Sequence, residues 1–321
     1  MIQLSQGNCG SFVSGKYRPL SLKHFTQSNT MAEITVELIK TLRDKTNAGM
    51  MDCKAALSEA GGDLEEAETI LRKKGIADAD KKAGRAAKEG VIASRISEDG
   101  KTGILVEVNC ETDFVAKNEN FTAFVEEIID HIEGSASVDT VDALLAQDFS
   151  GDFTTLEEFI KAKVGQLGEN MGLNRFAKYE LSGDGVIGSY IHMQGRVGVL
   201  VEVKAGDSAT ASSDAFQTFV KDLTLHIAAA QPICVDRDGV DSSVVEKEKE
   251  IFAEQMKDKP AEIIERIIGG KMDKFYSTNC LLEQAFIKDG DKTIQDLIDE
   301  LDGDVSVVRF ERYAVGEQAG D

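Results

Sequence analysis

Few residues of this sequence have the types and spacing that chemistry at an active site requires. Gly183, Gly185 and Gly188 match the G-x-G-x-x-G pattern, whose glycines let a backbone approach a dinucleotide pyrophosphate. Such a site lies between a strand and the N-terminus of a helix, whereas Gly185 begins a predicted strand here. The equivalent segment of an internal repeat, residues 88–93, also lacks the pattern. We therefore predict no nucleotide site on these glycines.

Histidines and cysteines supply no alternative catalytic set. His131 and His226 occupy equivalent positions in the two copies of the repeat, which indicates a structural role, and His192 has no carboxylate or cysteine partner near it in sequence. The cysteines include no Cys-x-x-Cys pair and no histidine at metal spacing: Cys9, Cys53, Cys110, Cys234 and Cys280. P-loop, nucleophile-elbow and zinc-protease motifs are absent from the sequence. The sequence predicts no catalytic residue, no metal ligand, no cofactor and therefore no enzyme.

One short run, Thr112-Asp113-Phe114-Val115, interrupts the internal repeat. Residues 90–132 align without a gap onto residues 185–227, and most shared positions are glycines or apolar residues that a fold needs. Thr112-Asp113-Phe114 aligns instead with Asp207-Ser208-Ala209, which reads as a loop of small and polar residues. The second copy does without an aromatic residue at this point. We therefore predict that Phe114 is not part of the core of the first copy.

The elements that hold this run in place begin with a small helical unit. Apolar positions at helical spacing predict three helices at about 35–47, 50–60 and 63–75, and Asp63 with Glu66 resembles a capping box for the third. We predict that residues 33–76 form a three-helix, ubiquitin-associated-like module. Residues 77–89 have no wide apolar face, so they are interpreted as an exposed helix or a linker.

Each copy of the repeat reads as strand, turn, strand, loop and helix. Apolar residues in an i, i+3, i+4 pattern follow the two strands, which is typical of a helix that covers a sheet. Residues 155–167 read as a helix between the copies, before a β-rich stretch that ends near 181. The predicted class is α+β, with two related core subdomains at 90–181 and 182–316. The second contains a helical hairpin insertion at 242–276, whose helices Pro260 separates, and a C-terminal module at 285–316.

Charge and composition limit the partners. The formal net charge of −21 argues against nucleic acid as the main ligand, because phosphate neutralisation needs clustered Lys and Arg. No apolar run approaches the roughly 20 residues of a membrane span, so no membrane partner is expected. An odd number of scattered cysteines indicates a reducing compartment and a cytoplasmic location, either bacterial or organellar. Residues 1–30 are acid-free and are interpreted as an unstructured extension, either upstream in-frame sequence or an organellar presequence.

Three runs, at residues 50–57, 106–117 and 226–232, closely resemble the elongation factor Ts family. The resemblance covers residues 31–316 with the motifs in the same order. It implies an N-terminal helical module, two related core subdomains, a hairpin and a C-terminal module, as interpreted above. It also implies that the partner is elongation factor Tu, a GTPase that delivers aminoacyl-tRNA, and that this protein promotes release of its GDP.

The same resemblance implies which residues meet the partner. Asp113 and Phe114, with Thr112 and Val115 beside them, would enter the GTPase domain near its magnesium and phosphate site, Phe114 as an apolar wedge. Further implied contacts are Arg43, Met50, Met51 and Lys54 of the helical module, Leu167, Gly168 and His192 of the core, and Ile287 of the C-terminal module. Lys288 stands where some members have an apolar residue, which leaves its contact open.

An exchange factor of this kind needs no acid, base or nucleophile. A protein that binds the nucleotide-free GTPase more tightly than the GDP-bound form must weaken GDP binding by the same free energy. Burial of one Phe side chain supplies only about 1.5–3 kcal/mol, so several contacts must combine. Two other classes stay open: a ubiquitin- or nascent-chain-binding adaptor that uses the helical module, and an enzyme with an α+β core. Self-association also stays open, because the hairpin could pack against a second copy.

Overall fold

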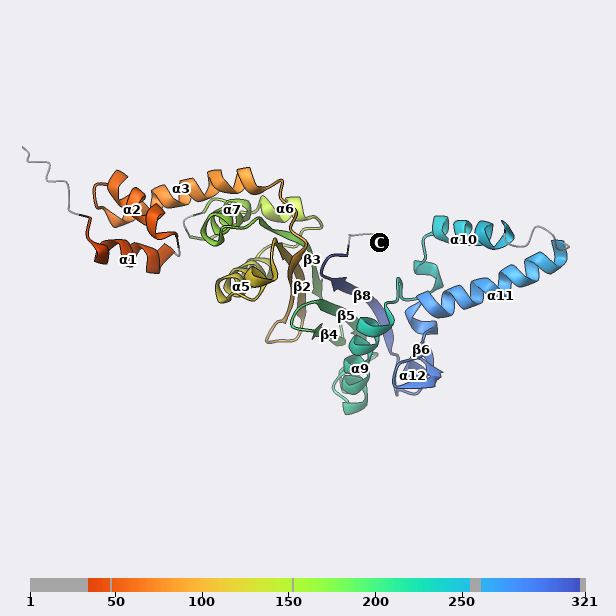
Figure 1. Cartoon of the computed structure of the whole chain (residues 1–321). Coiled ribbons are helices and arrows are strands. Elements are labelled where there is room, and N and C mark those ends of the chain that lie inside the picture. Colours follow the sequence, from red (N-terminus) through yellow and green to blue (C-terminus); the bar gives the residue numbers. More distant parts are fainter. Residues whose placement is uncertain (1–33, 47, 152, 255–260, 318–321) are drawn as a thin grey trace, which may run out of the picture.

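The computed structural model describes residues 34–46, 48–151, 153–254 and 261–317. The chain runs from a helical N-terminal unit, through two sheets with their helices, to a long helical arm and back to the second sheet (Figure 1). The α+β class is confirmed. The extension predicted at residues 1–30 lies outside the described residues. In the described ranges, no helix is long and apolar enough to cross a membrane.

Three helices form the N-terminal unit: α1 (Val36–Thr46), α2 (Met50–Glu59) and α3 (Leu64–Lys82). They enclose a small core in which Leu42, Cys53 and Leu57 are fully buried. Asp63 caps α3, because its side chain accepts a hydrogen bond from the Glu66 backbone N–H at 2.9 Å. The predicted end of the third helix at Gly75 is wrong, since α3 continues to Lys82.

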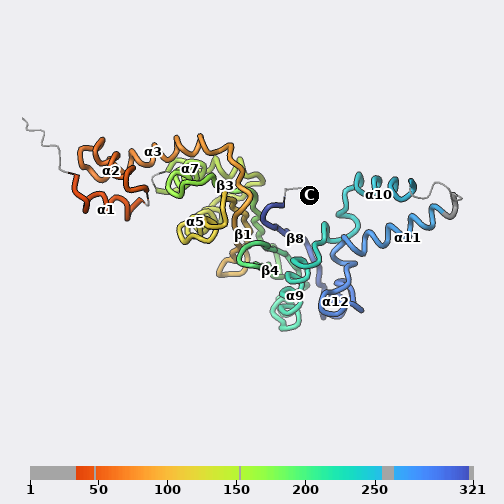
Figure 2. Tube along the Cα trace, in the orientation of Figure 1, coloured from red at the N-terminus to blue at the C-terminus, as the bar shows by residue number. Residues whose placement is uncertain are grey.

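Tertiary packing keeps α3 helical through Gly75. The helix lies along α7 (Leu156–Leu167), as Figure 2 shows, and a Cβ atom built on Gly165 would lie 2.3 Å from the Cα atom of Gly75. The two glycines thus let the helix backbones touch. A glycine inside a helix costs roughly 1 kcal/mol relative to alanine, and this packing offsets the cost. The segment interpreted as an exposed helix or linker is helical up to Lys82, and Ala79 is buried in the core of the first repeat.

The first repeat is a three-stranded antiparallel sheet in the order β1-β2-β3, with helices inserted between β2 and β3. The strands are β1 (Glu89–Ile96), β2 (Thr102–Cys110) and β3 (Met171–Glu180), and the helices are α4 (Asp113–Ala116), α5 (Glu119–Gly134), α6 (Val141–Leu145) and α7. Helix α5 buries Phe121, Phe124 and Ile128 completely against the sheet and α7. The predicted order of strand, turn, strand and helix is confirmed in this copy, but the predicted loop before α5 contains the one-turn helix α4.

The second repeat follows the same plan, with the order β4-β5-β8. Its elements are β4 (Gly185–His192), β5 (Val197–Lys204), α8 (Ser208–Ala211), α9 (Asp214–Ala230) and β8 (Ser306–Ala314). Strand β8 pairs with β5 as β3 pairs with β2, and the register shifts at equivalent places, between Glu107 and Val108 and between Glu202 and Val203. The repeat therefore includes a third strand, although the gap-free alignment covered only two.

The two sheets pack against each other through their inner faces. Ile92 and Leu105 of the first copy share an apolar cluster with Ile187 and Leu200 of the second. Two tyrosines complete this cluster, Tyr179 from β3 and Tyr313 from β8. The inner faces are covered only when both copies are present, so this cluster unites the repeats.

Two arginines cross this interface reciprocally. The guanidinium carbon of Arg175 on β3 lies 4.3 Å from the ring centre of Tyr313, and that of Arg309 on β8 lies 4.0 Å from the ring centre of Tyr179. Each arginine also donates Nε–H to a buried glutamate of its own sheet. Arg175 donates to Glu107 at 2.7 Å, and Arg309 donates to Glu202 at 2.8 Å.

The arm is the predicted helical hairpin, inserted before the last strand of the second repeat. It comprises η1 (Arg237–Gly239), α10 (Ser242–Glu254) and α11 (Ala261–Asn279), and it projects away from the sheets (Figure 1). Pro260 lies outside the described residues. The chain then returns through η2 (Leu281–Glu283), β6 (Ala285–Phe286), β7 (Asp289–Thr293) and α12 (Ile294–Asp299) to β8.

Candidate partner-binding site

The run that interrupts the repeat forms the one-turn helix α4, directly after β2. Thr112 caps it, because Oγ1 accepts a hydrogen bond from the Val115 backbone N–H at 3.3 Å. In the second repeat, Asp207 caps α8 in the same way by accepting from the Thr210 N–H at 2.7 Å. The prediction of a loop at 207–209 is therefore wrong. The backbone of this turn is duplicated, and only its side chains differ.

Helix α4 presents Phe114 to solvent. The Phe114 side chain is 82% exposed, whereas Val115 and Ala116 of the same turn pack against the core of the first repeat. Val115 and Ala116 thus attach α4 to the core, while the Phe114 ring faces solvent. The prediction that Phe114 lies outside the core is confirmed.

Asp113 lies beside this ring and is also exposed. Its Oδ2 accepts a hydrogen bond from Nζ of Lys117 at 2.8 Å, one helical turn along the chain. The Lys117 ammonium group holds the pKa of the Asp113 carboxyl below its usual value, so the carboxylate is charged at neutral pH. Ion pairs between exposed side chains stabilise a fold little, so this contact leaves Asp113 free to exchange partners.

A carboxylate that the sequence did not single out fixes the start of α4. Oε2 of Glu169 accepts hydrogen bonds from the backbone N–H of Glu111 at 3.1 Å and of Thr112 at 3.0 Å, and Oε1 accepts from Thr112 Oγ1 at 2.6 Å. In return, Glu111 Oε1 accepts from the Asn170 N–H at 2.7 Å. We call this set the Glu169 clamp. It holds the backbone of α4 from the neighbouring end of α7.

The clamp brings two predicted site regions together. Gly168 ends α7 in the left-handed region, at φ 83°, and turns the chain so that Glu169 faces Thr112. Leu167 packs partly against the core of the first repeat. Leu167 and Gly168 therefore lie next to the run 112–115, from which more than fifty residues separate them in sequence. The sequence signal for this arrangement is weak, since it consists of one glycine after a helix and one following acid.

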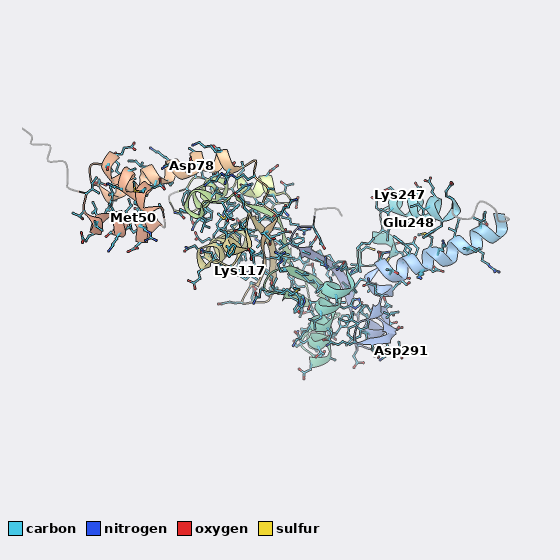
Figure 3. The ribbon with its side chains drawn as sticks, viewed as in Figure 1. Met50, Asp78, Lys117, Lys247, Glu248 and Asp291 are labelled. Atoms are coloured by element: carbon cyan, nitrogen blue, oxygen red, sulfur yellow. The ribbon has the colours of Figure 1, made fainter. Side chains whose placement is uncertain are left out.

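The predicted contacts of the helical unit form a separate exposed surface. Met51 is 74% exposed, and Met50, Arg43 and Lys54 are exposed beside it on α1 and α2. Figure 3 shows Met50 on this unit, apart from Lys117, which marks the end of α4. The structure therefore does not bring these four residues to Phe114. The two surfaces are held in a fixed arrangement, because α3 of the helical unit packs along α7 of the first repeat.

Comparison with known proteins decides the family. A family model described as elongation factor TS matches residues 111–317. The chain belongs to this family. It is 45% identical over 291 residues to elongation factor Ts of Trichlorobacter lovleyi, which covers 88% of this chain and 93% of that protein. Elongation factor Ts of Nitratiruptor sp. is 46% identical over 290 residues, with the same coverage of 88% and 93%. Membership of the elongation factor Ts family assigns the chain to translation elongation.

The remaining site residues suggested by the family resemblance lie in the second repeat and its C-terminal part. His192 is exposed at the end of β4, where its Nδ1 lies 2.8 Å from the hydroxyl of Tyr190. The Ile287 side chain is exposed next to β6. Lys288, which stands where some family members have an apolar residue, forms an ion pair with Asp222 of α9. Its Nζ lies 2.6 Å from Oδ1 of Asp222, so its charge has a partner within the chain. These residues form no cluster with α4.

The two repeated histidines have internal partners. Nε2 of His131 lies 3.1 Å from Oε1 of Gln147, and Nε2 of His226 lies 2.9 Å from Oε1 of Gln284. Burial lowers the pKa of both imidazoles, which favours the neutral form. Nδ1 of His226 accepts a hydrogen bond from the Ile287 N–H at 3.4 Å, so this ring holds the backbone beneath an exposed site residue. Among the described residues, no cluster of His, Cys, Asp or Glu could hold a metal ion.

Proposed function

We propose that this protein is a guanine nucleotide exchange factor that binds elongation factor Tu in its GDP-bound form and promotes release of the GDP during translation elongation. Membership of the elongation factor Ts family supports the partner. The observation that carries the proposal is Phe114, an aromatic side chain 82% exposed on a turn that the Glu169 clamp fixes. A ring displayed in this way on a rigid turn suits insertion into another protein.

Insertion of Asp113 and Phe114 near the magnesium and phosphate site is the proposed mechanism. Phe114 supplies an apolar wedge, and the charged Asp113 supplies an acceptor that competes for donors or ligands around the magnesium ion. Because α4 is already ordered, little conformational entropy is lost when it enters the partner. The emptied GTPase gains these contacts and the GDP-bound form does not, so GDP is bound more weakly by the same free energy.

One ring does not supply enough free energy for this exchange. Burying a Phe side chain yields about 1.5–3 kcal/mol, or roughly one to two decades of affinity. We propose that the other site residues, exposed or half-buried, add to it: Thr112, Val115, Leu167 and Gly168 around α4, Arg43, Met50, Met51 and Lys54 on the helical unit, His192 on β4, and Ile287 near the arm. Contacts spread along the molecule favour a partner that lies along its length.

A GDP-release assay tests the proposed function. Elongation factor Tu is loaded with a fluorescent GDP analogue and mixed with excess unlabelled GDP and a small amount of this protein. We expect faster release with each increment of the protein, and recovery of the GDP chemically intact, since exchange involves no bond cleavage. An unchanged release rate at saturating protein would reject the function. The adaptor alternative has no further observation in its favour.

Replacing Asp113 tests the role of the magnesium ion. If Asp113 competes for magnesium ligands, the effect of Asp113→Ala should depend on the magnesium concentration. With magnesium chelated, the variant should promote GDP release from elongation factor Tu at the same rate as the unsubstituted protein. At millimolar magnesium, it should promote release about tenfold more slowly. Lys117→Ala, which frees the same carboxylate, serves as the matched control and should not slow release. Stopped-flow fluorescence measures all three proteins. An equal defect of Asp113→Ala at both magnesium levels would exclude the magnesium route and leave the wedge intact.

A further inference from the structure

The root of the arm contains a pair of thiols. Cys234 follows α9 where the chain enters the arm, and Cys280 follows α11 where the chain leaves it. The two residues form a parallel bridge, in which the Ile233 N–H donates to the Asn279 carbonyl and the Leu281 N–H donates to the Cys234 carbonyl, each at 2.9 Å. The segments that enter and leave the arm are therefore held side by side at the cysteines.

The geometry of the pair is close to that of a disulfide. The two Sγ atoms lie 3.5 Å apart. Neighbouring strands are about 4.8 Å apart, which lies inside the range of roughly 4.4–6.8 Å between Cα atoms that disulfides span. A disulfide has sulfurs about 2.0 Å apart, so the two must approach by about 1.5 Å. Small side-chain rotations supply this approach without a change in the backbone pairing.

The surroundings keep the two sulfurs facing each other. Cys234 and Cys280 share a small apolar cluster with Val240, Val245 and Phe275. Arg237 closes one side of the root: its Nη2 donates to Oε2 of Glu283 at 2.8 Å, and its guanidinium carbon lies 4.5 Å from the ring centre of Tyr276. These neighbours enclose the pair, so both sulfurs are buried at the root.

We propose that Cys234 and Cys280 are an oxidation site at which hydrogen peroxide drives formation of a disulfide that fastens the root of the arm. This inference does not rest on the proposed function. The Cys234 side chain is 8% exposed and Cys280 is fully buried, so Cys234 meets the oxidant first. Burial raises the pKa of both thiols, that of Cys280 to about 12, so we expect oxidation to be slower than that of an exposed thiol.

The reaction has two steps. The Cys234 thiolate attacks one oxygen of the peroxide: the S–O bond forms, the O–O bond breaks, and the departing hydroxide takes up a proton to become water. The Cys280 sulfur then attacks the sulfenic sulfur of Cys234, the S–S bond forms, the S–O bond breaks, and a second water leaves with the proton of Cys280. Two thiols are oxidised to one disulfide, and one peroxide is reduced to two waters.

The disulfide would close a covalent loop around the whole arm. Backbone hydrogen bonds at the root now hold the entering and leaving segments together, and these bonds open whenever the root fluctuates. A covalent link keeps the segments together through such openings. We therefore expect amide exchange at Leu281 and Leu282, which donate across the root, to slow at least tenfold in the oxidised protein.

The experiment treats the full chain with increasing hydrogen peroxide, in a Cys9→Ser background that removes the thiol outside the described residues. Peptide mapping without reductant should find Cys234 joined to Cys280, with both thiols lost in step, while the unpaired buried thiols of Cys53 and Cys110 remain. In Cys234→Ser, Cys280 should survive as a thiol. Loss of all buried thiols at one rate, or over-oxidation of Cys234 without a cross-link, would overturn the proposal. The peptide map of the Cys9→Ser protein tests the proposal even if Cys234→Ser does not fold.

Discussion

Replacing Phe114 with alanine should slow GDP release from elongation factor Tu at least tenfold and leave the thermal melting of this protein unchanged. The ring is 82% exposed, so its removal takes nothing from the core. In the complex it would be buried, and loss of about 1.5–3 kcal/mol of burial corresponds to roughly one to two decades in affinity for the emptied GTPase. Release kinetics and circular dichroism on the same preparation measure the two effects separately.

The internal repeat supplies a matched control for this substitution. Ala209 of α8 occupies the position equivalent to Phe114 and is also exposed. Adding Ala209→Phe to Phe114→Ala restores an exposed ring on the same type of turn, but in the other repeat, and should not restore release. Phe114→Leu should recover part of the rate. A normal rate for Phe114→Ala, or an altered melting curve, would remove Phe114 from the proposed site.

Replacing Arg175 with alanine should lower the free energy of unfolding by about 3–5 kcal/mol, because it leaves a buried carboxylate without its cation. The side chain of Glu107 is almost completely enclosed, and after loss of Arg175 its one remaining hydrogen bond of those described is from the side-chain amide of Asn109, at 3.0 Å. The substitution also removes the contact with the Tyr313 ring. Urea unfolding followed by circular dichroism gives the free energy.

Arg309 is the control for Arg175, since it makes the equivalent ion pair and ring contact in the other repeat, while Arg175 also donates Nη2–H to the Ala314 carbonyl at 3.2 Å. Its side chain is 47% exposed, against 16% for Arg175, so water can compensate more of its loss. Arg309→Ala should therefore lower the free energy of unfolding by less than Arg175→Ala does. Combining Arg175→Met with Glu107→Met should recover much of the stability, because it removes both charges. An equal cost for the two alanine substitutions would show that burial of the charge is not the cause.

The strands and helices of each repeat were predictable because their signals are local. Alternating β-branched residues, a turn glycine and an i, i+3, i+4 helix pattern lie within one stretch of each copy. Comparing the copies also predicted that Phe114 is outside the core. That comparison works because a residue needed for packing recurs in both copies, whereas a residue needed for binding does not.

Features that depend on distant contacts were not predictable. Glu169 meets Thr112 from 57 positions away, and Arg175 meets Glu107 from 68 positions away. Neither pair leaves a periodic signal. The continuation of α3 beyond Gly75 has the same origin, because glycine is a helix-ending residue unless a neighbouring helix rests on it. The number of strands shared by the repeats was underestimated, since β8 follows an inserted arm.

The touching backbones of Gly75 and Gly165 set the spacing between the two surfaces that we propose to meet elongation factor Tu. Met50 and Met51 lie on the helical unit to which Gly75 belongs, and Phe114 lies beside the end of α7. A methyl group on Gly165 would lie 2.3 Å from the Cα atom of Gly75, whereas one on Gly75 would meet its nearest neighbours at 3.5 Å, an ordinary contact distance. A side chain at Gly165 would therefore tilt one helix against the other and change the position of the methionines relative to the ring. One residue outside the proposed site would thus determine whether both surfaces meet the partner at the same time.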